Sequence, residues 1–210
     1  MTTESFPICL LHKPTDTIVD AVLQTSIEEA QLEDWRNLWV PAREEGIKRC
    51  VSTKQIECIP QSYRWKWDKK IAYYDGILAK RTFSVVCNDR TEGLMLVTTP
   101  AFALEESQKG KPLVYVDFLE TAPWNINGFL GQGEYRGVGS VLLRAAVLLS
   151  LQEEYQGRIG LQSLPDAEAF YSRLQMRDLG LEHSKEGLRY FEMTPIEANA
   201  FLTRGGRYEI

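Results

Sequence analysis

Histidine and cysteine, which build most zinc sites in proteins, are scarce in this sequence. Only two histidines occur, and the four cysteines are so far apart that none forms a Cys-x-x-Cys pair. Zinc sites usually combine such pairs with histidines at short spacing. The sequence therefore predicts no metal site.

Long apolar segments are missing as well. The chain has no run of about 18 apolar residues, the length that a membrane-spanning helix needs. The first residues, MTTESFPICLLHKP, lack the basic start of a secretory signal. We therefore expect a protein of the reducing cytoplasm that has no membrane partner.

Positive charge is also in deficit, because 24 Lys and Arg residues stand against 29 Asp and Glu residues. Proteins that bind nucleic acid depend on Lys and Arg to neutralise phosphates. Residues 63–70, YRWKWDKK, do mix aromatic and basic side chains as single-strand binders do. In an acidic chain we interpret this segment as partly buried Trp65 and Trp67 between solvated lysines. No nucleic-acid partner is predicted.

Apolar residues are plentiful enough for one folded domain, at 44% of 210 residues. Their spacing predicts helices within residues 15–24 and 26–39, with an interruption at Pro41. Farther along, strands are predicted over 80–88, 93–102, 112–120, 158–164 and 188–193, and helices over 138–154 and 165–176. This order indicates an α/β (α+β) protein with a mixed sheet.

A glycine-rich segment, GQGEYRGVGS, leads into the long apolar helix. A Walker A loop is excluded because its lysine is absent. A dinucleotide fingerprint made by Gly131, Gly133 and Gly137 is disfavoured, because no strand lies directly upstream. The acidic residue that it needs at the end of the next strand would also fall in LSLQEEYQG, in or just after the helix. A cradle of backbone N–H groups for a pyrophosphate fits better. Gly137 and Gly139 would let the backbone approach the phosphates at a helix N-terminus.

Two motifs resemble one known family. EYRGVGSVLL resembles the acyl-CoA signature of the GNAT superfamily of N-acyltransferases, [Q/R]-x-x-G-x-[G/A], although Glu134 departs from it. DAEAFYSRLQM resembles the family's A-x-x-F-Y-x-x-x-G-F segment, except that Gln175 and Met176 replace Gly-Phe. LVYVDFLETAP looks like the family's fourth strand. The resemblance covers about residues 80–193.

The resemblance implies a GNAT-like, mixed and mostly antiparallel central sheet flanked by helices. Residues 1–79 would form a helical N-terminal extension packed on a core of residues 80–210, and residues 124–133 would be an insertion near the active-site mouth. The implied activity is transfer of an acyl group from acetyl-CoA or another acyl-CoA to a small-molecule or peptide amine, by direct attack. A homodimer is compatible with this family. The alternative is a non-catalytic GNAT-like module with an acyl-CoA-binding or regulatory role.

The same resemblance implies the residues that bind the co-substrate. The backbones of Leu119 and Thr121 would pair with the pantetheine arm, and the loop would bind the phosphates. The loop residues are Tyr135, Arg136, Gly137, Val138, Gly139 and Ser140.

The implied catalytic residues are a tyrosine and a carboxylate. Tyr171 would protonate the departing thiolate, and its alternative role is that of a core aromatic residue. Asp117 and Glu120 compete as the base, with Glu120 slightly favoured, and either could be a plain surface carboxylate. On an ideal strand the two would face opposite sides of the sheet, but this strand often bulges in the family.

Overall fold

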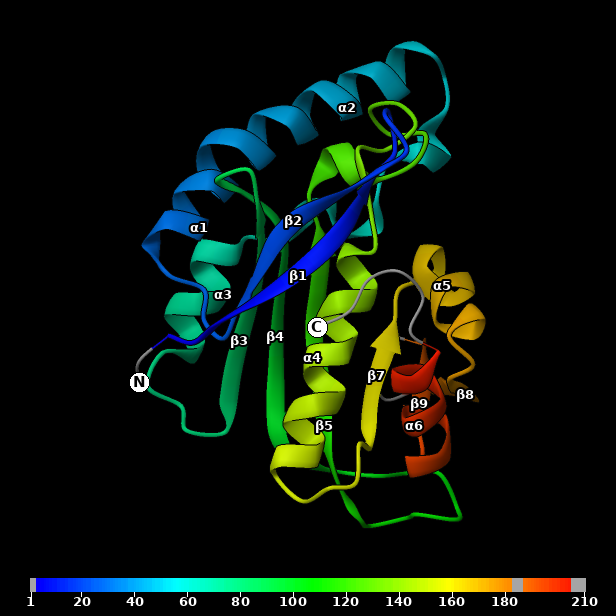
Figure 1. The fold of residues 1–210 in the computed structure, drawn as a ribbon. Helices are drawn as coiled ribbons and strands as arrows, with labels where there is room; N and C mark the ends of the chain where they lie inside the picture. Colours follow the sequence, from blue (N-terminus) through cyan, green and yellow to red (C-terminus); the bar gives the residue numbers. More distant parts are fainter. Residues whose placement is uncertain (1–2, 183–186, 205–210) are drawn as a thin grey trace.

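A computed structural model describes residues 3–182 and 187–204. Within these residues a nine-stranded sheet forms the centre of the molecule, in the order β6-β1-β2-β3-β4-β5-β7-β9-β8 (Figure 1). The strands are β1 (Ser5–His12), β2 (Thr17–Gln24), β3 (Lys80–Cys87), β4 (Arg90–Phe102), β5 (Pro112–Thr121), β6 (Tyr135–Arg136), β7 (Ile159–Ser163), β8 (Arg177–Glu182) and β9 (Leu188–Met193). Among the described strands only β5 and β7 pair in parallel.

Helices cover both faces of this sheet. They are α1 (Glu29–Asp34), α2 (Val40–Ser52), α3 (Trp67–Tyr74), α4 (Val138–Gln152), α5 (Glu168–Arg173) and α6 (Pro195–Thr203). Figure 1 shows α4 crossing the middle of the sheet, with α5 and α6 near β7 and β9. The predicted mixed, mostly antiparallel sheet flanked by helices is confirmed.

Strand β4 divides the interior into two apolar clusters because its side chains alternate between the faces. Met95 and Val97 pack with α4, whereas Leu94 and Leu96 pack with the tryptophans of the helices on the other face. All four side chains are completely buried. The α4 face and the α1–α3 face are therefore distinct, and a residue's place on β4 or β5 decides which helices it meets.

The predicted helix within residues 15–24 is wrong, since Thr17–Gln24 is strand β2. The segment TIVDAVLQ is rich in β-branched residues, which favour strands. Its apolar residues fit a helical stripe and an alternating strand pattern almost equally over so few positions. The partners decide the outcome, because β2 pairs with β1 on one side and β3 on the other. The first 79 residues thus share one sheet with the rest.

Pro41 does not interrupt the next helix as predicted. α1 continues through a π-helical turn, η1 (Trp35–Trp39), directly into α2. The Val40 N–H donates to the carbonyl oxygen of Trp35, five residues back. Proline lacks an N–H and crowds the preceding turn. The wider π-helical turn just before Pro41 lets one helical rod continue from residue 29 to 52.

Residues 124–133, the predicted insertion, form a loop that is fastened to α2 and β4. Phe129 is fully buried, and its ring occupies the space that a Cβ on Gly46 of α2 would need. The buried carboxylate of Glu92 accepts hydrogen bonds from Trp124 Nε1 and Asn125 Nδ2, both at 2.7 Å. The start and the middle of the loop are therefore anchored by buried groups.

We expect Gly46→Ala to lower the free energy of unfolding by about 1–3 kcal/mol, because the new methyl group overpacks against Phe129. In a Phe129→Ala background the same change should instead stabilise by up to about 1 kcal/mol, since alanine is the better helix former. Urea unfolding of the four proteins tests this. The same sign in both backgrounds would contradict the contact.

Cys50 and Cys58 form a disulfide that joins the end of α2 to the short helix η2 (Ile56–Cys58). This pair was not predicted from the sequence, and it stands against the expected reducing cytoplasm, where disulfides are rare. None of the described helices has the length and apolar character needed to cross a membrane.

Candidate functional site

Strands β5 and β7 separate after a short parallel contact. Their pairing runs from Val114, opposite Ile159, to Val116, opposite Leu161. Residues 117–121 of β5 therefore have no strand partner on the side of β7. Unpaired backbone groups at a sheet edge can accept an extended ligand as an added strand.

A β-bulge lies at the point where the two strands separate. On β4 the consecutive residues Leu96 and Val97 pair with Phe118 and Val116, so that Asp117 is an extra residue on β5. Such a bulge shifts the side-chain alternation by one position. Asp117 and Phe118 consequently both lie on the α1–α3 face, although they are neighbours in sequence.

The bulge brings the two predicted carboxylates to one face of the sheet. Asp117 is bound by neighbouring strands, because Lys80 Nζ donates to Oδ1 at 2.9 Å and Thr98 Oγ1 donates to Oδ2 at 2.7 Å. Glu120 lies three residues on and belongs to the same face, where it meets α2 and α3. An ideal strand would have placed them on opposite faces.

Glu120 is buried, with 6% of its surface exposed. Arg43 Nη2 of α2 donates to its Oε1 at 3.1 Å, and Trp67 Nε1 of α3 donates to its Oε2 at 2.7 Å. Burial raises the pKa of the Glu120 carboxyl, while the charge of Arg43 and hydrogen bonds from Ser62 and Trp67 oppose the rise. A carboxylate with a raised pKa takes up a proton more readily than an exposed one.

Arg43 was missed by the sequence analysis, as was Lys70 on α3. Arg43 Nη1 donates to the carbonyl oxygens of Tyr63 and Trp65, so this arginine ties Glu120 to the segment before α3. Lys70 Nζ lies 3.1 Å from the centre of the Phe118 ring. No local sequence pattern could have identified either residue, because their partners are distant in the chain.

The predicted phosphate cradle is the start of α4. Gly137 is the N-cap and has φ 109°, a left-handed conformation that glycine adopts readily. No side chain caps this helix, and its first turn holds no acidic residue. The first N–H groups of a helix lack intrahelical partners and carry a partial positive charge. The start of α4 therefore offers free donors for an anion.

Gly139 marks the junction of the cradle with β5. A Cβ at this position would stand 3.2 Å from Phe170 Cζ of α5 and 3.9 Å from Leu119 Cδ2 of β5. The helix N-terminus and the unpaired part of β5 are therefore close neighbours. A ligand that binds the helix N-terminus could therefore also reach the unpaired part of β5.

The departure at Glu134 is compensated, since its carboxylate forms an ion pair with Arg90 Nη2 at 2.7 Å. Tyr135 and Arg136 form the short strand β6, which pairs with β1. The Tyr135 side chain is buried, and its hydroxyl accepts a hydrogen bond from Asn88 at 3.0 Å. Burial raises the pKa of Tyr135 to about 12. Its side chain is thus part of the packing, whereas Arg136 is exposed.

Tyr171 lies on α5 with 7% of its surface exposed. Its ring centre is 5.1 Å from that of Phe170 and 5.7 Å from that of Phe191. Burial raises the pKa of the hydroxyl, so this group keeps its proton at neutral pH. Within the described part of the chain we find no hydrogen-bond partner for it. These contacts make Tyr171 part of the core packing, and its role as a proton donor stays a prediction.

A hollow of about 190 Å³ lies beside the cradle, between α4, α5 and α6, and three arginines line it. Arg144 Nη1 and Nη2 donate to the carbonyl oxygens of Phe201 and Leu202, and its Nε has no partner among the described residues. Its charge therefore has no described carboxylate to neutralise it. The other two arginines are Arg173 and Arg204.

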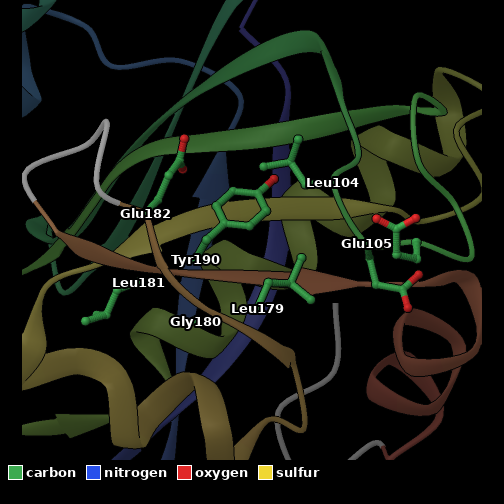
Figure 2. Close-up of a pocket in the computed structure, with 8 residues that line it drawn as sticks. Leu104, Glu105, Leu179, Gly180, Leu181, Glu182 and Tyr190 are labelled. Atoms are coloured by element: carbon green, nitrogen blue, oxygen red, sulfur yellow. The ribbon is translucent and has the colours of Figure 1, made fainter.

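A second hollow, of about 390 Å³, has the opposite character. It lies at the outer strands β8 and β9, and Figure 2 shows Tyr190 between Glu182 and Glu105. Its carboxylates would repel phosphate groups. In residues 3–182 and 187–204 no cluster of three or more His, Cys, Asp and Glu residues could hold a metal ion.

No protein-family model and no curated protein matches this sequence. Solved structures do match in three dimensions. RimJ of Mycobacterium smegmatis, solved with CoA-disulfide, gives a TM-score of 0.53 at 12% identity over 99% of this chain and 96% of that one. Aminoglycoside acetyltransferase AAC(6')-Ib, solved with coenzyme A and kanamycin, gives a TM-score of 0.52 at 14% identity, over 86% of this chain and 98% of that one. FeeM, an N-acyl amino acid synthase from uncultured soil microbes, gives a TM-score of 0.52 at 11% identity, over 86% of this chain and 93% of that one.

These likenesses show the fold. The protein has a GNAT-like N-acetyltransferase fold, and the resemblance predicted from the two sequence motifs is confirmed. Matches at 11–14% identity establish the fold alone.

Proposed function

We propose that the protein is an acyl-CoA-dependent N-acyltransferase, which moves an acyl group, in the simplest case acetyl, from CoA to an amine by direct attack. The observation that carries this proposal is the junction at Gly139. There the uncapped N-terminus of α4 meets the unpaired part of β5. The helix N-terminus could bind anions, and the unpaired part of β5 could pair with an extended chain. CoA contains both a pyrophosphate and a pantetheine arm.

The donor would lie along this path in three parts. The pantetheine arm would pair with the backbones of Leu119 and Thr121, and the pyrophosphate would bind the N–H groups of residues 137–140. The adenosine end, with its additional phosphate, would reach the hollow lined by Arg144 and two further arginines. Guanidinium groups bind phosphate well.

The reaction would follow from the groups around the separated strands. An amine loses a proton and attacks the thioester carbonyl, an amide bond forms, and the carbon–sulfur bond breaks. We assign the proton acceptor to Glu120, acting through a water molecule because its own oxygens already bind Arg43 and Trp67. Tyr171 would give its proton to the departing thiolate. Asp117, bound by Lys80 and Thr98, would position the bulge.

The acceptor would enter from the α1–α3 face. We propose that the helices between residues 29 and 74, together with the loop 124–133, cover that face of the sheet, while β1 and β2 of the first 79 residues extend the sheet of the core formed by residues 80–210. The acceptor would be a small-molecule or peptide amine, and the cytoplasm is the proposed compartment. No metal is needed for this chemistry.

Thioester consumption with a panel of amines tests the activity, and calorimetry with CoA tests the donor site. Turnover that depends on one class of amine would support the enzyme. Tight CoA binding without turnover on any amine would favour the non-catalytic module, for which the firm anchoring of both carboxylates is the specific observation. Absence of CoA binding would overturn both.

Removing only the hydroxyl of Tyr171 should slow the chemical step. General acid catalysis is typically worth about 100- to 10,000-fold, and a CoA thiolate is already a tolerable leaving group, so we expect Tyr171→Phe to lower kcat by about 100-fold. CoA affinity should change little, and the melting temperature should hold because the aromatic packing persists. Tyr155→Phe, beyond the C-terminal end of α4, is the matched control. A wild-type kcat in the Tyr171 variant would show that this residue contributes to packing and is not the proton donor.

A further inference from the structure

One lysine on the α1–α3 face has aromatic neighbours where a carboxylate partner would be expected. Lys70 Nζ lies 3.1 Å from the centre of the Phe118 ring and 4.9 Å from that of Trp65. Within residues 3–182 and 187–204 no carboxylate comes within ion-pair distance of this nitrogen. Cation–π contact with two rings holds the side chain in place.

The position of this amine coincides with the β-bulge of β5. Phe118 is the residue beside the extra residue Asp117, where β5 has already lost its partner β7. The charges of Glu120 and Asp117 both act on Lys70, so its amine lies near both carboxylates. Each carboxylate has a cation of its own, Arg43 for the former and Lys80 for the latter.

The environment also makes the amine nucleophilic. Partial burial lowers the pKa of Lys70 to about 8, although Glu120 and Asp117 oppose that change. About a quarter of such amines are neutral at pH 7.5, against roughly 0.1% for an exposed lysine with a pKa near 10.4. Only the neutral amine attacks a thioester.

We propose that Lys70 is itself an acyl acceptor, which takes the acyl group from bound acyl-CoA when no free amine occupies the site. The inference rests on the proposed donor site. Lys70 Nζ forms an amide bond with the thioester carbonyl carbon, the carbon–sulfur bond breaks, and the proton lost by the amine ends on the CoA thiolate. No further reactant is required. The product is a neutral Nε-acyl-lysine beside Phe118 and Trp65.

Other lysines of the same region provide internal controls. Lys80 is also near the bulge, but its amine is bound by Asp117 at 2.9 Å. Lys66 and Lys69 flank the start of α3 and are exposed. Non-enzymatic acylation would also favour the amine with the lowest pKa. Suppression by excess CoA, together with the preference for Lys70, therefore identifies transfer from the bound donor.

The test is incubation of the purified protein with acetyl-CoA, without any amine, followed by peptide mass spectrometry. We expect one acetyl group per chain, located on Lys70 and formed at least about tenfold faster than on Lys66 or Lys69. The rate should rise with pH and level off above about 8, as the neutral fraction of the amine saturates. Excess CoA should suppress the modification by occupying the donor site.

Lys70→Arg keeps the cation and removes the nucleophile, so it should abolish the modification while preserving the melting temperature and the CoA affinity. CoA binding, measured separately by calorimetry, distinguishes the two possible failures. Protein that binds CoA but leaves Lys70 unmodified, or acetylates its lysines evenly, would overturn the inference and leave the donor site standing. Protein that does not bind CoA would overturn the proposed function itself, and the inference with it.

Discussion

Gly139→Asp is expected to weaken CoA binding by roughly 100-fold while the protein stays folded. A carboxylate about 5 Å from a phosphate, at an effective dielectric constant near 20, costs about 3 kcal/mol, and that corresponds to roughly 100-fold in Kd. The fold should tolerate the change for two reasons. An acidic residue in the first turn favours a helix, and the new Cβ would meet only the edge of the Phe170 ring, at 3.2 Å.

Gly139→Asn is the matched control, because it has nearly the same shape without the charge. We expect it to retain most of the CoA affinity, so that the difference between the two variants isolates the electrostatic effect. Calorimetry gives both affinities, and thermal unfolding confirms that both variants are folded. Equal affinities of Gly139→Asp and the wild type would show that CoA phosphates do not bind at the start of α4.

Glu120→Ala is expected to lower the free energy of unfolding by about 3–5 kcal/mol, because it leaves the charge of Arg43 buried without a partner. Arg43 is 7% exposed, and its remaining bonds are to two backbone carbonyls. For a chain of this size such a loss lowers the melting temperature by on the order of 10 °C.

Replacing both members of the pair should cost much less than removing one. In Arg43→Met with Glu120→Leu, apolar side chains of similar size fill the space, and buried ion pairs exchanged in this way are often neutral or better. Glu120→Gln should fall between the extremes, since one amide oxygen can still accept a hydrogen bond. If the single and double variants lost equal stability, Arg43 and Glu120 would not be coupled.

The sequence predicted the parts of the fold whose information is local. The strand over 112–120, the helix over 138–154 and the glycines at its start all lie where expected. The errors occurred where contacts with residues distant in the sequence determine the secondary structure. Residues 17–24 became a strand because β1 and β3 pair with it, and the chain passes Pro41 without a break because a π-helical turn precedes it.

For the candidate site, the sequence alone was enough to select candidate residues but not to predict which face of the sheet their side chains occupy. The spacing of Asp117 and Glu120 implies opposite faces, and the pairing of β5 with β4 is what reverses this. Arg43 and Lys70 come from segments without a motif, 77 and about 50 residues before Glu120. They lie near Glu120 because α2 and α3 pack on the same face of the sheet. The spacing of apolar residues within either helix does not predict that packing.

The π-helical turn at Trp35–Trp39 sets the rotational phase of everything that follows it in α2. Each residue of an α-helix advances the rotation by about 100°. Shortening this turn by one residue would therefore swing Arg43 away from Glu120 and Gly46 away from Phe129 at once. A single deletion in this turn would thus disconnect both the buried ion pair and the loop, whereas a point substitution could reach only one of them.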